Sequence, residues 1–195
     1  MKLATNTLKT KVLETILSNV RPQKERRIGV EIETIFYDTN LKRLPVNPGN
    51  SYSSYDLMGD LLLFQKNKKN PCAYSLEPGG QLEWASSPFV SLHDINSQWN
   101  DHTSQLGKLC RDNKILPVDF AIDPLYSPEE IKLIDMKKYR FMNDMFKSVG
   151  THGMWMMRNS ASVQINIDMV SRRDGENMAF IADCLQPFCS FLFSH

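Results

Sequence analysis

Residues 74–88 read YSLEPGGQLEWASSP, and this segment constrains the fold more than any other part of the chain. Pro78 fixes one backbone angle, and the two glycines after it can adopt conformations that are closed to other residues. The flanking residues 73–77 and 81–86 carry the composition of β-strands. The segment therefore predicts a hairpin with a stiff turn at its end.

The predicted hairpin brings two carboxylates close to its turn. Glu77 ends the first strand and Glu83 lies within the second. Side chains alternate along a strand, so Gln81 and Glu83 share one face, while Leu82 and Trp84 share the other. Carboxylates fixed side by side repel each other, and a bound cation relieves that repulsion. The alternative is a charged hairpin exposed to solvent.

Composition describes an ordinary globular chain of 195 residues, with 42% hydrophobic and 23% charged residues. This length suits a single domain, residues 1–195, with a sizeable core. The net charge of +1 argues against nucleic acid or a membrane surface as partner. Four cysteines without CxxC spacing, and no signal-peptide pattern at the N-terminus, predict a cytoplasmic protein with reduced thiols. Oligomeric state is not readable from the sequence.

Hydrophobic periodicity predicts an α+β fold with an antiparallel or mixed sheet. Besides the hairpin, strands are expected at residues 26–37, 115–122 and 154–168. Helices are expected at residues 8–20, 56–65, 92–113, 128–146 and 172–195. The last 17 residues are apolar and end without a polar tail, which predicts that the chain is the N-terminal fragment of something longer.

Two further strands carry residues with suitable chemistry. Glu31 and Glu33 lie two apart in a strand, so their side chains share a face about 6–7 Å apart and could hold a hard cation. The polar face of the strand at 154–168 combines an arginine, which grips carboxylates or phosphates, with amides whose oxygens bind hard cations. Its members are Arg158, Ser160, Ser162, Gln164, Asn166 and Asp168. The alternative for both strands is an outer face that meets water.

Three segments in order resemble the glutamate–cysteine ligases of the plant and proteobacterial type. They are IGVEIE at 28–33, SLEPGGQLEWASSP at 75–88 and MMRNSASVQINID at 156–168. The resemblance runs from about residue 27 to the end of the chain. The hairpin block and the ASVQINID block are specific in combination.

The resemblance implies an ATP-dependent ligase with a glutamine-synthetase-like fold, built on a curved antiparallel sheet flanked by helices and incomplete in this chain. It implies that L-glutamate is phosphorylated by ATP and then joined to L-cysteine, the first step of glutathione synthesis, with Mg²⁺ bridging the phosphates. Matched motif positions imply that Glu31, Glu33, Glu77, Glu83 and Gln164 bind metal. Gln81 and Asn166 would lie near the substrates, and Arg158 would bind substrate and act in catalysis.

One departure from the family pattern concerns the arginine. Related sequences tend to have Arg where this chain has Asn159, and Arg158 stands one residue earlier. A shift by one residue along a strand turns a side chain to the other face. The family's nucleotide-binding part lies largely beyond the resembling segment, so the isolated chain is expected to be inactive. A related ligase with another amine acceptor, and a non-catalytic remnant that binds glutamate and Mg²⁺, remain open.

Overall fold

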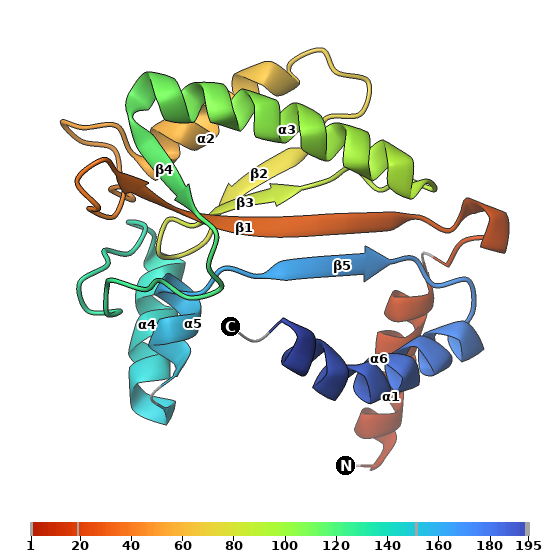
Figure 1. The fold of residues 1–195 in the computed structure, drawn as a ribbon. Coiled ribbons are helices and arrows are strands. Elements are labelled where there is room, and N and C mark those ends of the chain that lie inside the picture. Colours follow the sequence, from red (N-terminus) through yellow and green to blue (C-terminus); the bar gives the residue numbers. More distant parts are fainter. Residues whose placement is uncertain (1, 19, 151, 194–195) are drawn as a thin grey trace. The chain divides into compact units, whose positions relative to one another are not determined.

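Figure 1 shows the computed structural model, which describes residues 2–18, 20–150 and 152–193. The chain forms two compact units. One unit comprises Met1–Ile28 and Asn166–His195, and the other comprises Gly29–Ile165. The expectation that residues 1–195 form one domain stays a prediction.

An open antiparallel sheet of five strands organises the second unit, and the α+β prediction is confirmed. The sheet order is β2-β3-β1-β4, and β5 also pairs with β1. The β5 pairing is antiparallel, since the Glu33 amide donates to the Ser162 carbonyl while the Asp168 amide donates to the Arg27 carbonyl. The strands are β1 (Ile28–Asp38), β2 (Ala73–Leu76), β3 (Leu82–Ala85), β4 (Ile115–Val118) and β5 (Val163–Ile167).

The register of the central strands separates an acidic face from an apolar one. Glu33 lies opposite Glu83 across β1 and β3, and Ser75 lies opposite Glu83 across β3 and β2. The next position pairs Ile32 with Trp84. Because side chains alternate between faces, the acids share one face and the apolar residues share the other.

Two helices cover the apolar face, as Figure 1 shows above β2 and β3. Helix α2 (Ser54–Gln65) contributes Leu57 and Leu61, which are fully buried. Helix α3 (Leu92–Asn113) places the Trp99 ring 5.0 Å from the Trp84 ring, centroid to centroid. Burial of these large side chains supplies the main free energy that holds the sheet in place.

Helix α4 (Lys137–Val149) begins nine residues later than the helix predicted at 128–146. The residues before it form turns, and several of their polar groups bond to side chains instead of to a helical main chain. The Ser127 hydroxyl donates to Glu130, and the Pro128 and Ile131 carbonyls accept from Arg158. These bonds to a distant side chain replace the helical bonds that the local sequence favours.

The long strand predicted at 154–168 is wrong in its first part. Residues Gly153–Arg158 form a short helix, α5, which packs against α4, and only Val163–Ile167 form a strand. The Asn159 amide donates to the Trp155 carbonyl and the Ser160 hydroxyl to the Met156 carbonyl, so the chain stays coiled to this point. Arg158 therefore does not share a strand face with Gln164.

The first unit contains α1 (Lys2–Leu17), the short helix η1 (Gln23–Glu25) and α6 (Arg172–Leu192). Arg26 pairs with Asp174 at 2.5 Å, and Arg27 pairs with Asp168 at 3.1 Å. These ion pairs link the two residues before β1 to the residue after β5 and to the first turn of α6. No helix in the described part of the chain combines the length and apolarity needed to cross a membrane.

Candidate metal centre

Three glutamates from three neighbouring segments meet on the acidic face of the sheet. Glu33 comes from β1, Glu83 comes from β3, and Glu77 follows directly after β2. One carboxylate oxygen of each lies within 4.8 Å of the others, and all three side chains are half-buried. Oxygens that share one Mg²⁺ or Ca²⁺ at about 2.0–2.6 Å lie within this range of each other, so the donor set fits a single hard cation.

Neighbouring polar side chains hold two of these carboxylates. The Ser162 amide donates to Glu33 Oε2 at 3.0 Å, and its hydroxyl donates to Glu33 Oε1 at 2.8 Å. The Ser75 hydroxyl donates to Glu83 Oε1 at 2.6 Å. Partners behind the ligands orient them, which is a general feature of metal sites.

The third carboxylate, Glu77, lies in an environment that disfavours its charge. Burial raises its pKa above the ordinary value, and the negative charges of Glu33 and Glu83 raise it further, while Lys138 acts in the opposite direction. A carboxylate in such surroundings gains much from a cation, because the cation removes the repulsion that the fold imposes.

The turn that carries Glu77 requires both of its glycines. The Gly80 amide donates to the Glu77 carbonyl at 2.8 Å, and Gly80 has a positive φ of 81°. A Cβ on Gly79 would lie only 2.5 Å from the Arg158 carbonyl oxygen. The prediction that the turn needs a special glycine conformation is confirmed at Gly80. Glycine is needed at position 79 for a different reason, because any side chain there would collide with the main chain of Arg158.

The other residues predicted to bind metal lie around this cluster. The Gln164 side-chain amide donates to Glu33 Oε1 at 3.3 Å, so Gln164 is beside the cluster. Glu31 contributes negative charge that acts on Glu77. The structure thus brings Glu33, Glu77 and Glu83 together and places Gln164 and Glu31 at the edge.

The residues predicted to bind substrate occupy different environments. Gln81 is 1% exposed, and its Nε2 donates to the Ser160 carbonyl at 2.8 Å, while its Oε1 is buried without a hydrogen-bond partner. Asn166 belongs to the other compact unit. Their substrate-binding roles stay predictions.

Arg158 is enclosed by protein acceptors. It is 8% exposed, its Nη1 donates to the Pro128 and Ile131 carbonyls, and its Nη2 donates to Asn143 Oδ1. Burial lowers its pKa from the usual value, with Glu129 opposing the shift. In this conformation the guanidinium joins three segments of the protein through hydrogen bonds. Its predicted catalytic and substrate-binding role stays a prediction.

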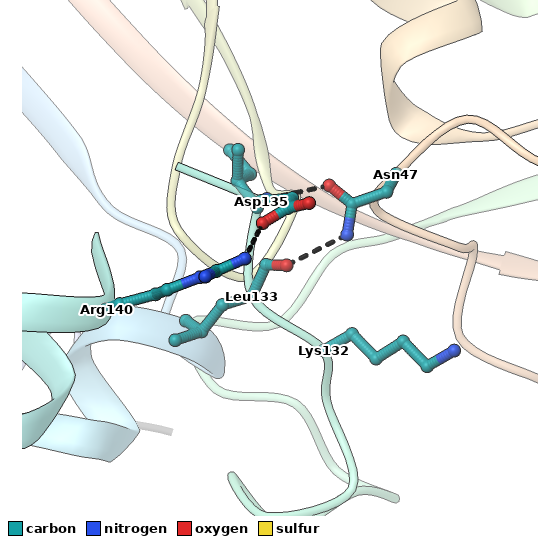
Figure 2. Close-up of a pocket in the computed structure, with 6 residues that line it drawn as sticks. Asn47, Lys132, Leu133, Asp135 and Arg140 are labelled. Carbon is teal, nitrogen blue, oxygen red and sulfur yellow. Dashed lines mark hydrogen bonds and ion pairs between the residues drawn. The ribbon is translucent and has the colours of Figure 1, made fainter. Parts of the chain in front are cut away.

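Two pockets lie in the same unit, and neither is lined by the three clustered glutamates. Figure 2 shows the first, of about 370 Å³, where Asn47 bridges Leu133 and Asp135 through its side-chain amide, and Arg140 pairs with Asp135. The second, of about 460 Å³, is lined by Ile122, His152, Trp155, Met156 and Ser160. The acidic cluster is thus a patch on the sheet, separate from both hollows.

Some residues of the site escaped prediction. Ser162 was predicted only as a member of the polar strand face, and its hydrogen bonds to Glu33 were not. Ser75 precedes Glu77 by two residues, so strand alternation could have revealed it. Lys138 acts on Glu77 from α4, and no sequence pattern links these two positions.

Comparison with known proteins assigns the family. The sequence matches the model of glutamate-cysteine ligase family 2 (GCS2) over residues 27–186. The chain belongs to glutamate-cysteine ligase family 2. This is a family of ligases, and the resemblance seen in the sequence motifs is confirmed.

Plant members of the family are among the similar proteins. Chloroplastic glutamate–cysteine ligase A of Oryza sativa subsp. indica is 25% identical over 196 residues, covering 92% of this chain and 38% of the relative. The chloroplastic enzymes of Arabidopsis thaliana and Brassica juncea are 27% and 28% identical over 190 residues each. The chain spans 36% and 37% of the lengths of those two relatives.

Proposed function

We propose that this chain forms part of an ATP-dependent glutamate–cysteine ligase and supplies the carboxylates that hold its catalytic Mg²⁺. The observation that carries the proposal is the cluster of Glu33, Glu77 and Glu83, whose oxygens lie within 4.8 Å of one another. Family membership supports the ligase, and the hard oxygen donors support the metal.

The proposed reaction forms an amide bond in two steps. A γ-carboxylate oxygen of L-glutamate attacks the terminal phosphorus of ATP, and ADP leaves. The amine nitrogen of L-cysteine then attacks the acyl carbon, phosphate leaves, and the nitrogen loses a proton, which yields γ-glutamylcysteine for glutathione synthesis. Phosphoryl transfer depends on positioning and charge stabilisation more than on a protein nucleophile.

The residues of this chain have defined tasks in that scheme. Glu33, Glu77 and Glu83 bind the cation, and Ser162 and Ser75 keep two of the carboxylates oriented. A Mg²⁺ ion held by these carboxylates would supply positive charge that offsets the charge of the phosphate oxygens. Gln164 and Glu31 complete the polar surroundings, while Gln81 and Asn166 are proposed to face the substrates. A cytoplasmic location is also part of the proposal.

The test is Glu83→Gln in the longest product of this reading frame, assayed for ADP release with L-glutamate, L-cysteine and Mg²⁺. We expect turnover to fall about 100- to 1,000-fold, the range seen when one group that stabilises charge in a transition state is removed. The matched control is Glu176→Gln, which changes an exposed glutamate paired with Arg172 on α6. Unchanged turnover in Glu83→Gln would contradict the metal assignment.

The amine acceptor is tested separately by product analysis with a panel of amino acids. A product formed with an amine other than cysteine would indicate a related ligase with a different amine acceptor. Glutamate binding without any ADP release would indicate a non-catalytic binding protein.

A further inference from the structure

The main chain of the Pro-Gly-Gly turn is bonded to three distant segments of its unit. The Pro78 carbonyl accepts from the Ile134 amide at 2.9 Å. The Gly79 amide donates to the Met157 carbonyl at 3.2 Å, and the Gly79 carbonyl accepts from Arg43 Nη2 at 3.3 Å. Each main-chain polar group of the two residues that can form a hydrogen bond is therefore used. Such a turn has little freedom to move.

Arg158 anchors the segments that supply these bonds. Its Nη1 donates to the Pro128 carbonyl at 2.7 Å and to the Ile131 carbonyl at 2.8 Å, which fixes the turns that precede Ile134. Its Nη2 donates to Asn143 Oδ1 at 2.5 Å, which joins α5 to α4. The Arg158 guanidinium thus links the two segments that bond to the turn, one ending at Ile134 and the other containing Met157.

Arg43 also bonds to the Pro-Gly-Gly turn and to the main chain of Arg158. Its Nη2 lies 3.3 Å from both the Gly79 carbonyl and the Arg158 carbonyl, and its Nη1 pairs with Asp123, whose side chain is fully buried. A planar guanidinium can bind several acceptors at once in this way, whereas the single ammonium of lysine cannot reproduce the pattern.

We infer that Arg158 and Arg43 are positioning residues that hold the Glu77 carboxylate in the cation cluster through the main chain of the Pro-Gly-Gly turn. The inference rests on the proposed cation-binding function. Carboxylate oxygens of Glu77, Glu33 and Glu83 lie within 4.8 Å of one another, so without a cation their like charges push the side chains apart. The two arginines oppose that push. They act before any cation or substrate arrives, because all of their contacts are made within the protein.

The test measures Mn²⁺ binding to the 195-residue chain by the electron paramagnetic resonance signal of free Mn²⁺, with no substrate present. We expect Arg158→Lys to weaken Mn²⁺ binding about 10- to 100-fold, the range for partners that orient metal ligands. Arg140→Lys is the matched control, since Arg140 lies on α4 and its side chain is 69% exposed. An arginine that only bound substrate would leave Mn²⁺ affinity unchanged.

Circular dichroism distinguishes a displaced carboxylate from a lost fold. Where Arg158→Lys does not fold, Asn143→Ala replaces it, because that variant removes a single acceptor from the same guanidinium. We expect Asn143→Ala to fold and to bind Mn²⁺ more weakly than the wild type. Arg43→Lys is expected to behave in the same way while keeping a charge beside Asp123.

The outcomes separate this inference from the proposed function. Wild-type protein that binds no Mn²⁺ would contradict the metal centre itself, and the inference with it. Wild-type protein that binds Mn²⁺, with equal affinity in folded Arg158→Lys or Asn143→Ala, would overturn only the positioning role.

Discussion

His102 lies behind the acidic face, on the apolar side of the sheet, where it is 2% exposed. Its Nδ1 lies 2.9 Å from the Tyr74 hydroxyl, and its ring lies 5.6 Å from the Trp84 ring, centroid to centroid. Burial lowers its pKa from 6.5 to about 4, because the charged imidazolium is poorly solvated there. The histidine is therefore neutral in the folded protein at physiological pH.

This depressed pKa predicts a loss of stability in acid. The unfolded chain takes up a proton as the pH falls through 6.5, while the folded protein resists until about pH 4. The free energy of unfolding should therefore decrease across this window, by about 3 kcal/mol for this group. Urea unfolding between pH 7 and pH 4.5 measures the slope. It should be shallower in His102→Gln and unchanged in His93→Gln, which alters an exposed histidine. Equal slopes in all three proteins would contradict the prediction.

At the scale of elements, helix α2 depends on the capping box at its start. The Asp56 amide donates to the Ser53 hydroxyl at 3.3 Å, and the Ser53 amide donates to Asp56 Oδ2 at 2.9 Å. Ser53→Ala should lower the free energy of unfolding by about 1–2 kcal/mol, as measured by urea unfolding. Ser104→Ala, at an exposed position of α3, should change it by less than about 0.5 kcal/mol. A neutral Ser53→Ala would show that the cap contributes nothing.

The predictable elements are those whose pattern and burial agree. Helix α3 occupies the predicted residues 92–113, and the hairpin has the predicted faces, because Leu82 and Trp84 are 1% exposed while Glu83 is not buried. Residues 154–158 alternate weakly, and their helix is fixed by packing against α4. The start of α4 depends on Arg158, 30 residues from Pro128. Long-range bonds of this kind leave no periodic trace in a sequence.

The candidate site was predictable to the extent that it follows strand alternation. Glu33 and Glu83 come together because β1 and β3 pair in the register that their apolar residues require. The buried setting of Arg158 was not predictable, because its acceptors are main-chain carbonyls, which every residue type possesses.

For the whole molecule, we expect the 195-residue chain alone to bind Mn²⁺ yet release no ADP with ATP, L-glutamate and L-cysteine. The chain covers only 36–38% of three plant relatives, and the family resemblance assigns the nucleotide mainly to parts outside the matched segment. A coupled ADP assay measures this, with the chloroplastic glutamate–cysteine ligase of Arabidopsis thaliana as positive control. Cysteine-dependent ADP release by the isolated chain would refute the prediction.

The pairing of β1 with β5 has a consequence for how the protein is made. Ser162 is 129 residues from Glu33, the carboxylate that it binds. At about 5–20 residues per second, a ribosome adds Ser162 roughly 6–26 s after Glu33. Contacts this distant in sequence are also slow to form once the chain is complete. The fully supported cluster can thus form only well after the hairpin that carries Glu77 and Glu83.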